Sequence, residues 1–271
     1  MSRWAFGVEY LGRAAQGWQS QGTKRGPDSS GYPSGVADCL CDALMKMTGC
    51  EQVPVCAGRT DSGVHALNQV MHWDLPAHLT HSARAWIFGL NAHLRDIRLT
   101  WARRVPGHFH ARFTALDRTY AYLILNVDCV PVFHAGRVAW ERRPLDVDSM
   151  QQAANFLLGT HDFSAFQAAG CSAATSYRTL KTIQIEQRGS LIRITLCANA
   201  FLQRMVRIIT GCLWQVGLGK WQADKIRSIL HSKDRKQAAA TAAAEGLYFL
   251  GPRYPMEFGL PPSPDGHILL A

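Results

Sequence analysis

One short connection constrains the fold of this chain more than any other feature of its sequence. Residues 178–186 and 191–197 are both rich in apolar and β-branched side chains, and only a few residues around Arg188-Gly189-Ser190 separate them. A linker this short reverses the chain and makes the two strands antiparallel neighbours. The sequence therefore predicts at least one antiparallel hairpin.

Strand-like and helix-like stretches alternate along the rest of the chain. The clearest strand is expected at residues 118–127 (RTYAYLILNV), and the helical spacing of residues 36–48 predicts a helix that ends before Gly49. Further strands are expected at 4–10, 53–56, 67–73, 97–105 and 246–250, and further helices at 80–90, 147–158, 201–217, 221–231 and part of 233–244. This order favours an α+β fold, with antiparallel sheet and helices on one face.

The length of 271 residues allows a full core in one or two domains. Pro131 and Pro144 interrupt the pattern between residues 128 and 146, which favours a division into halves 1–127 and 128–271. A loop is expected at residues 23–35, which are rich in Gly, Ser and Pro.

Composition favours a polyanionic partner. The formal net charge is +9, and neutralised phosphates release counterions when such a protein binds nucleic acid. No apolar run is long enough to span a membrane, and Met1-Ser2-Arg3-Trp4 leads into a strand pattern without a signal peptide. The eight cysteines form no Cys-x-x-Cys pair, so reduced thiols in a cytoplasmic protein are expected.

The stretch VCAGRTDSGVHALNQV, residues 55–70, holds a single carboxylate between two apolar runs. Asp61 follows Arg59 by two residues and precedes His65 by four. An acid in such a turn is consistent with a nucleophile, with a charge partner, or with a side chain that caps nearby backbone N–H groups.

Asp61-Ser62-Gly63 is also the local signature of an aspartic protease. That chemistry needs two carboxylates that share a proton, and this chain has one such tripeptide. A protease would therefore have to be a symmetric dimer, and Arg59 and Thr60 stand where an apolar strand usually precedes the acid.

The longer string around Asp61, AGRTDSGVHA, resembles the catalytic motif of the tRNA pseudouridine synthases of the TruA family. Further stretches resemble that family in the same order: 109–113 (FHARF), Arg118-x-Tyr120-x-Tyr122, 159–163, 199–207 and 245–247. The similarity covers nearly the whole chain. One departure is a longer loop at residues 26–34, with Ala37 after Val36.

The resemblance implies a pseudouridine synthase fold, with two ferredoxin-like halves whose sheets meet at a central catalytic cleft. It implies that Asp61 is the nucleophile that isomerises uridine to pseudouridine. Whether Asp61 adds to the base, attacks C1′ or removes a 2′ proton is left open. It also implies a homodimer that binds the anticodon stem-loop of tRNA and modifies positions 38, 39 and 40.

The resemblance implies roles for three further residues. Tyr120 would stack on the target base, Arg59 would fill the space of the flipped uridine, and Arg207 would keep Asp61 charged. Each has a simpler interpretation: Tyr120 as a core residue, Arg59 as a loop arginine in a salt bridge, Arg207 as part of a solvated helix face. His65 and Arg112 are further candidates for contacts in the site.

No cofactor or metal is expected. The chain lacks both glycine-rich phosphate-loop motifs, and isomerisation of a uridine needs no redox group. His108-x-His110 offers two imidazoles, but no third ligand follows at a matching spacing. A non-catalytic tRNA-binding protein or RNA chaperone is the main alternative, although such a protein has no need of an acid facing phosphates.

Overall fold

The computed structural model describes residues 1–19, 35–129, 131–171 and 173–263, so the expected loop at 23–35 and the long segment 26–34 lie almost wholly outside it. The described residues form an α+β fold, as the sequence predicts. They divide into two compact units, residues 1–116 with 249–263 and residues 117–248.

The first unit has the strand order of a ferredoxin-like fold. Its strands are β1 (Ser2–Tyr10), β2 (Val55–Cys56), β3 (His65–Leu75) and β4 (Ile97–Arg104), and its helices are α1 (Val36–Thr48) and α2 (Ala83–Asn91). The order across the sheet is β4-β1-β3-β2, and every pair is antiparallel. With α1 between β1 and β2 and α2 between β3 and β4, this is the β-α-β-β-α-β pattern.

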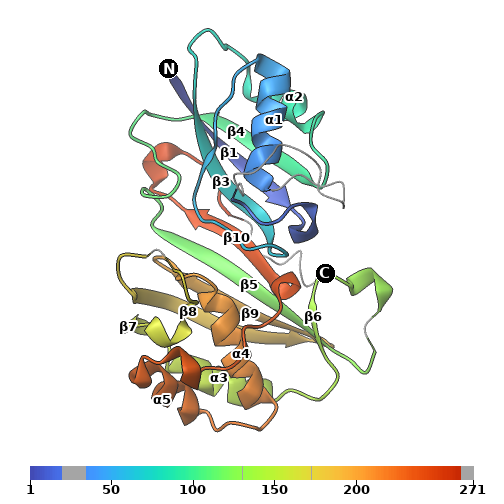
Figure 1. Ribbon diagram of the computed structural model, residues 1–271, viewed down its shortest axis with the longest axis vertical. Helices are drawn as coiled ribbons and strands as arrows, with labels where there is room; N and C mark the ends of the chain where they lie inside the picture. The colour runs from blue at the N-terminus through green and yellow to red at the C-terminus, as the bar shows by residue number, and fades with distance from the viewer. Residues whose placement is uncertain (20–34, 130, 172, 264–271) are drawn as a thin grey trace. The chain divides into compact units, whose positions relative to one another are not determined.

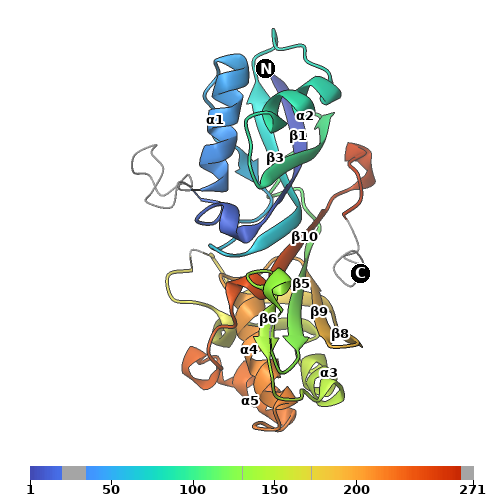
Figure 2. The ribbon, with the colours of Figure 1, turned by 90° about the vertical axis from the view of Figure 1, so that its right-hand side faces the viewer.

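The two helices cover one face of this sheet (Figure 1). Phe6, Trp73 and Trp86 are fully buried there, with ring centroids 5.3 Å apart for Phe6 and Trp73 and 6.3 Å for Phe6 and Trp86. Figure 2 shows the same helices from the side. The expected boundaries of α1 are confirmed, because Gly49 takes a left-handed φ of 71° and ends the helix. Ser82 caps α2, since its hydroxyl oxygen accepts from the Ala85 N–H at 3.2 Å.

Loops rather than helices cover the opposite face. Phe109, Ala111 and Phe258 pack there against Ala5 and Val70 of the sheet. This second layer fixes residues 105–116 of the first unit in space.

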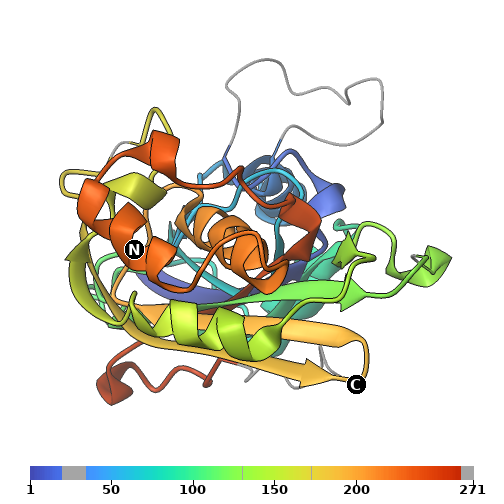
Figure 3. The same cartoon turned by 90° about the horizontal axis from the view of Figure 1, so that it is seen from below.

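The second unit repeats the pattern around β5 (Asp117–Asn126), β8 (Tyr177–Arg188) and β9 (Leu191–Ala198). The antiparallel order is β5-β9-β8-β7, where β7 is Gly159–Asp162, and β6 (Ala139–Glu141) runs parallel to β5. The expected hairpin is confirmed, since Gly189, at φ 55°, lies in the tight turn between β8 and β9. Helices α3 (Val147–Asn155), α4 (Met205–Gly217) and α5 (Asp224–Ser232) pack together (Figure 3).

The units do not have the bounds 1–127 and 128–271 that the prolines suggest. β5 pairs along its whole length with β9, so residues 117–126 belong to the second unit. β10 (Leu247–Arg253) starts in the second unit, and the chain returns to the first from residue 249.

Two helix predictions are partly wrong. The helix expected at 201–217 starts only at Met205, because Arg204 takes a left-handed φ of 58°. The Ala-rich stretch expected to be partly helical, 233–244, contains no α-helix but only the 3-10 turn Arg235–Gln237 and the start of a second one at Ala244. The small side chains let this stretch run close along α4 instead: a Cβ on Gly211 would lie 2.2 Å from the Ala240 carbonyl oxygen. Packing therefore overrides the helix propensity of alanine.

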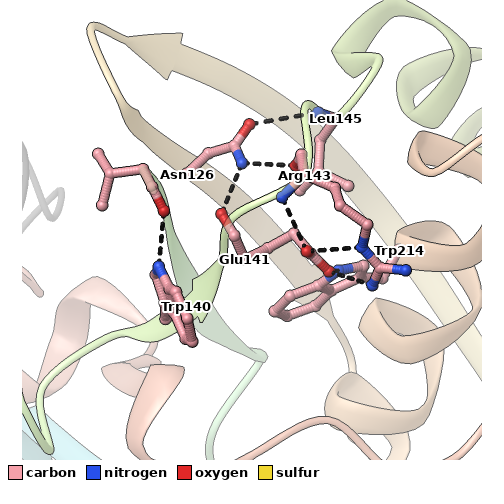
Figure 4. A network of polar contacts seen from close by, with 7 residues as sticks. Asn126, Trp140, Glu141, Arg143, Leu145 and Trp214 are labelled. Atoms are coloured by element: carbon pink, nitrogen blue, oxygen red, sulfur yellow. Dashed lines mark hydrogen bonds and ion pairs between the residues drawn. The ribbon is translucent and has the colours of Figure 1, made fainter. Parts of the chain in front are cut away.

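A polar network joins the end of β5 to the chain that follows β6 (Figure 4). Asn126 donates from Nδ2 to the carbonyl oxygens of Glu141 and Arg143, both at 2.7 Å, and accepts from the Leu145 N–H at 3.2 Å. One amide side chain thus replaces the strand partner that this irregular segment lacks.

Glu141 is the buried centre of the same network. Its carboxylate accepts from Nε and Nη2 of Arg143, at 2.9 and 2.7 Å, and from Trp214 Nε1 at 2.9 Å. Trp214 lies on α4, so Glu141 ties β6 to that helix. The hydrogen bonds from Arg143 lower the pKa of Glu141 to about 2, against the opposing effect of burial.

We expect Glu141→Gln to lower the free energy of unfolding by about 1–3 kcal/mol at pH 7, because it weakens charge-assisted hydrogen bonds. The depressed pKa stabilises the fold above about pH 4.5 and is lost as the pH falls towards 2, so the deficit of the variant should shrink over that window. Urea titrations from pH 7 to pH 3 measure this. Glu257→Gln, at an exposed position, is the control, and an equal loss in both variants would contradict the role of the network.

Candidate active site

Asp61 lies in the connection between β2 and β3, which is a tight turn. The Val64 N–H donates to the Asp61 carbonyl at 3.2 Å, and Gly63 takes a left-handed φ of 82°. The Gly63 N–H donates in turn to the Gly12 carbonyl at 3.3 Å. The backbone that carries Asp61 is therefore held from both sides.

Residues 12–18 lie directly against this turn. A Cβ on Gly12 would come within 2.2 Å of the Gly63 carbonyl, and one on Gly17 within 2.8 Å of the Thr60 carbonyl. Gly17 also has a φ of 86°, and the Trp18 N–H donates to the Thr60 carbonyl at 3.0 Å. Only glycine allows so close an approach at these two positions.

Buried polar side chains of β1 and β3 hold the Asp61 turn and its neighbours by hydrogen bonds. The Tyr10 hydroxyl and Thr60 Oγ1 lie 2.8 Å apart, and burial raises the pKa of the Tyr10 phenol, so the hydroxyl keeps its proton. Gln69 Nε2 donates to the Gly58 carbonyl at 2.6 Å. His65, which is 1% exposed, accepts the Gly12 N–H on Nδ1 at 3.0 Å. His65 thus positions the turn through the backbone.

The two candidate residues of this turn differ in exposure. Asp61 is half-buried and Arg59 is exposed. Burial raises the pKa of the neighbouring Cys56 thiol to about 12, although the positive charges of Arg59 and Arg112 lower it in part. Cys56 therefore stays a neutral thiol, and Arg59 and Arg112 share its surroundings.

Arg112 belongs to a turn at residues 110–114 in the layer opposite the helices. The N–H groups of Arg112 and Phe113 both donate to His110 Nδ1, at 3.1 and 3.2 Å. The Ala111 N–H donates to Nδ1 of His72 on β3 at 3.2 Å. Since Val55 of β2 pairs with His72, this turn lies beside the strand that leads to Asp61.

Tyr120 and Tyr122 lie on the same face of β5 but have different surroundings. The Tyr120 side chain is 9% exposed, and its ring meets Phe201 edge to face with centroids 5.1 Å apart. The Tyr122 hydroxyl donates to the Ala243 carbonyl at 2.9 Å, and its ring fills the space over Gly246. Tyr122 is thus a structural residue.

Arg207 lies on α4 and is half-buried, so it is not part of a solvated helix face. Its Nε donates to the Ala242 carbonyl at 2.8 Å, and its own carbonyl accepts from the Ala242 N–H at 3.1 Å. Burial raises the pKa of the Tyr122 phenol. The negative charge of Glu245 raises it further, and the positive charge of Arg207 lowers it in part. The guanidinium therefore has a fixed place between α4 and the Ala-rich stretch.

The predicted site residues are thus distributed over both units. Arg59 and Asp61 lie together in the first, and Tyr120 and Arg207 lie in the second. The sequence patterns did not single out Tyr10, Gln69 and His72, which hold the two turns of the first unit.

His108 and His110 do not act as a pair. The His108 ring lies 5.4 Å from Phe258, whereas the His110 ring lies 5.0 Å from His72. Within the described part of the chain, no cluster of three or more His, Cys, Asp or Glu side chains could hold a metal ion. In that same part, no helix combines the length and apolarity needed to cross a bilayer.

Comparisons with known proteins identify the class of enzyme. A family model described as tRNA pseudouridine synthase matches residues 153–255. The tRNA pseudouridine synthase A of Albidiferax ferrireducens is 45% identical over 96% of both chains. The tRNA pseudouridine synthase A of Pseudomonas aeruginosa is 41% identical, and the match covers 96% of this chain and 88% of that protein. The tRNA pseudouridine synthase A of Alcanivorax borkumensis is also 41% identical, and the match covers 100% of this chain and 98% of that protein.

A solved structure, a chain in the "Crystal Structure of a Cbf5-Nop10-Gar1 Complex", aligns with a TM-score of 0.34 and 14% identity over 91% of this chain and 49% of its own. A likeness this weak adds nothing to the sequence comparisons.

Fold, catalytic motif and relatives together define a tRNA-modifying enzyme. The chain belongs to the tRNA pseudouridine synthase A family. It is an isomerase that converts uridine in tRNA to pseudouridine, which confirms the expected activity. The family assignment argues against the aspartic protease, and against a tRNA-binding protein or RNA chaperone without catalysis.

The His72 contact gives the first unit a pH-dependent stability. Burial, followed by the charges of Arg3 and His110, lowers the pKa of His72 to about 4 from its ordinary 6.5. In the unfolded chain His72 is protonated below about pH 6.5, whereas in the folded protein it is protonated only near pH 4. The free energy of unfolding therefore falls as the pH drops across this window.

We expect His72→Gln to flatten this part of the stability curve, whatever its cost at pH 8. Denaturant unfolding at several pH values between 8 and 4.5 measures the slope. His93→Gln, at an exposed position in the same unit, should keep the slope of the parent protein. A slope left unchanged by His72→Gln would show that other groups cause the pH dependence.

Proposed function

We propose that this enzyme modifies uridines at positions 38, 39 and 40 in the anticodon stem-loop of tRNA, with Asp61 as the nucleophile. The choice of positions rests on the family resemblance, and the observation that carries the role of Asp61 is the close packing of its turn against Gly12 and Gly17 with the hydrogen bond of Thr60 to Tyr10. Catalytic groups need such preorganisation, because a small misplacement greatly slows the reaction.

A half-buried carboxylate suits the chemistry. The glycosidic bond of the uridine breaks, the base turns, and a carbon atom replaces the nitrogen at the link to the sugar. A carboxylate can stabilise or trap an electron-poor sugar or base during these steps. Attack on the base, attack on C1′ and removal of a 2′ proton are all within the reach of Asp61 as the nucleophile or base.

Arg59 and Tyr120 act on the flipped uridine. An exposed guanidinium two residues from Asp61 is suited to occupy the space that the base leaves, which offsets the few kcal/mol lost on unstacking. Tyr120 stacks on the base, and stacking on an aromatic side chain contributes about 1–3 kcal/mol. The edge-to-face contact with Phe201 supports this role, because it fixes the ring orientation.

The family resemblance implies that Arg207 keeps Asp61 charged. Its hydrogen bond to Ala242 holds the guanidinium in one place, as an electrostatic partner requires. The enzyme acts in the cytoplasm as a homodimer in which one tRNA touches both subunits. This last part rests on the family resemblance and on the net charge of +9, which suits a shape-based contact with phosphates.

We expect Asp61→Asn to abolish pseudouridine formation in a tRNA transcript while changing tRNA affinity by less than about threefold. Mapping the modified positions in the product of the parent enzyme tests the choice of 38, 39 and 40. Asp42→Asn removes the same charge from a half-buried position on α1 and should keep full activity. Normal turnover by Asp61→Asn would eliminate the nucleophile assignment.

We expect Tyr120→Phe to slow turnover at least tenfold with unchanged tRNA binding, because the ring still stacks but no phenol remains to accept or donate a proton late in the reaction. Tyr122→Phe is the matched control: it removes the hydrogen bond to Ala243 and should lower stability by about 0.5–1.5 kcal/mol instead. Thermal unfolding and single-turnover rates separate the two effects. A drop in tRNA binding for Tyr120→Phe would mean that the hydroxyl itself contacts RNA in the ground state.

A further inference from the structure

Phe113 is a large aromatic side chain held out into solvent. It is 75% exposed, at the tip of the turn formed by residues 110–114 in the first unit. A single exposed apolar residue is ordinary on a protein surface and needs no explanation by itself. The way in which this turn is built is what gives Phe113 its significance.

The turn is closed on itself by His110 and Thr114. The Thr114 N–H and Oγ1 both donate to the His110 carbonyl, at 3.0 and 2.7 Å. The N–H groups of Arg112 and Phe113 converge on His110 Nδ1. The backbone that presents Phe113 is therefore ordered by its own hydrogen bonds.

The same turn is anchored to its unit at Ala111, which is fully buried. The Ala111 N–H donates to His72, and its carbonyl accepts from the Tyr254 hydroxyl at 2.6 Å. A surface side chain on so fixed a base loses little entropy when it binds a partner, which is the advantage of preorganisation.

The ring of Phe113 contacts two neighbouring side chains of its own turn. The His110 ring lies 4.3 Å from it at an interplanar angle of 31°, and the Arg112 guanidinium carbon lies 5.7 Å from its centroid. With three quarters of the side chain exposed, the rest of the ring is free to stack on another flat group.

The Arg112 guanidinium borders this ring, and Arg59 of the Asp61 turn belongs to the same region of the first unit. Arg59 and Arg112 both act on the buried Cys56 thiol, and Val55, next to Cys56, pairs with the same His72 that anchors the turn. A flat aromatic ring beside guanidinium groups is the combination that binds single-stranded nucleic acid, because bases stack on the ring and phosphates pair with the cations.

We propose that Phe113 is a substrate-stacking residue on which an unpaired nucleobase of the bound tRNA, other than the uridine being isomerised, packs. The proposal rests on the proposed function, in which the RNA is bound at the Asp61 turn. Arg112 supports the ring and faces the phosphate of the same nucleotide. Phe113 thereby contributes to which RNA loop the enzyme accepts.

Phe88 provides a matched control within the same unit. It is 65% exposed and lies under a guanidinium, with Arg84 Cζ 5.2 Å from its centroid. It differs from Phe113 in its place, because it lies on α2 in the helical layer, on the face of the sheet opposite to the 110–114 turn.

The test compares Phe113→Ala, Phe113→Leu, Phe113→Trp and Phe88→Ala, each made in the Asp61→Asn protein so that tRNA affinity is measured without turnover. The expected losses for Phe113→Ala and Phe113→Leu are about 10-fold to 100-fold, the size of one base–aromatic stack. Phe113→Trp should restore parent affinity, with fluorescence quenched by bound tRNA. Phe88→Ala should bind as tightly as the parent, and thermal unfolding shows that each variant is folded.

A set of transcripts with one abasic nucleotide each then locates the stacked base. At one position, removal of the base should weaken tRNA binding by the parent protein but cause no further loss in Phe113→Ala. Such non-additivity is the signature of a direct contact between Phe113 and that base. Equal affinities of Phe113→Ala and Phe88→Ala, or no coupled position, would overturn the proposal. Mapping pseudouridine in the product of the unaltered enzyme is a separate result, so a failure at positions 38, 39 and 40 is distinguishable from a failure of Phe113.

Discussion

The close contact between residues 12–18 and the Asp61 turn is the constraint on which the first unit depends. Two backbone segments approach until a single Cβ at Gly12 or Gly17 would overlap the turn. Their hydrogen bonds then hold Thr60, Gly63 and Trp18 in one arrangement. Because Gly12 and Gly17 carry no side chain, main chain meets main chain at these two positions, and main-chain geometry has few soft degrees of freedom.

A second layer extends this rigidity to the other face of the sheet. His72 lies between β2, which leads to Asp61, and the turn that presents Phe113, and its neutral imidazole accepts the Ala111 N–H. One buried histidine thus relates the position of the Asp61 turn to that of an exposed aromatic ring. The first unit combines an acid, two arginines and this ring on one rigid support.

The second unit holds Tyr120 and Arg207 by a different arrangement. The Ala-rich stretch lies along α4 and exchanges two hydrogen bonds with Arg207, while Tyr122 donates to Ala243 beside it. The small side chains of the Ala-rich stretch permit the close approach of its backbone to Gly211 of α4. Arg207 is therefore fixed by its hydrogen bonds to the Ala-rich stretch, and Tyr120 by its edge-to-face contact with Phe201, rather than by local turn chemistry.

The sequence alone determined the α+β class, most element boundaries, the hairpin at Gly189 and the family, because these depend on local periodicity and on one long motif around Asp61. Only the tertiary structure decided that β5 joins the second unit, that residues 238–243 stay extended, and that His65 and His72 are buried hydrogen-bond acceptors. Strand pairing and burial join residues far apart in the chain, and a local pattern carries no record of such partners. The acid was evident from its neighbours in sequence, whereas the groups that hold it in place became evident only from its neighbours in space.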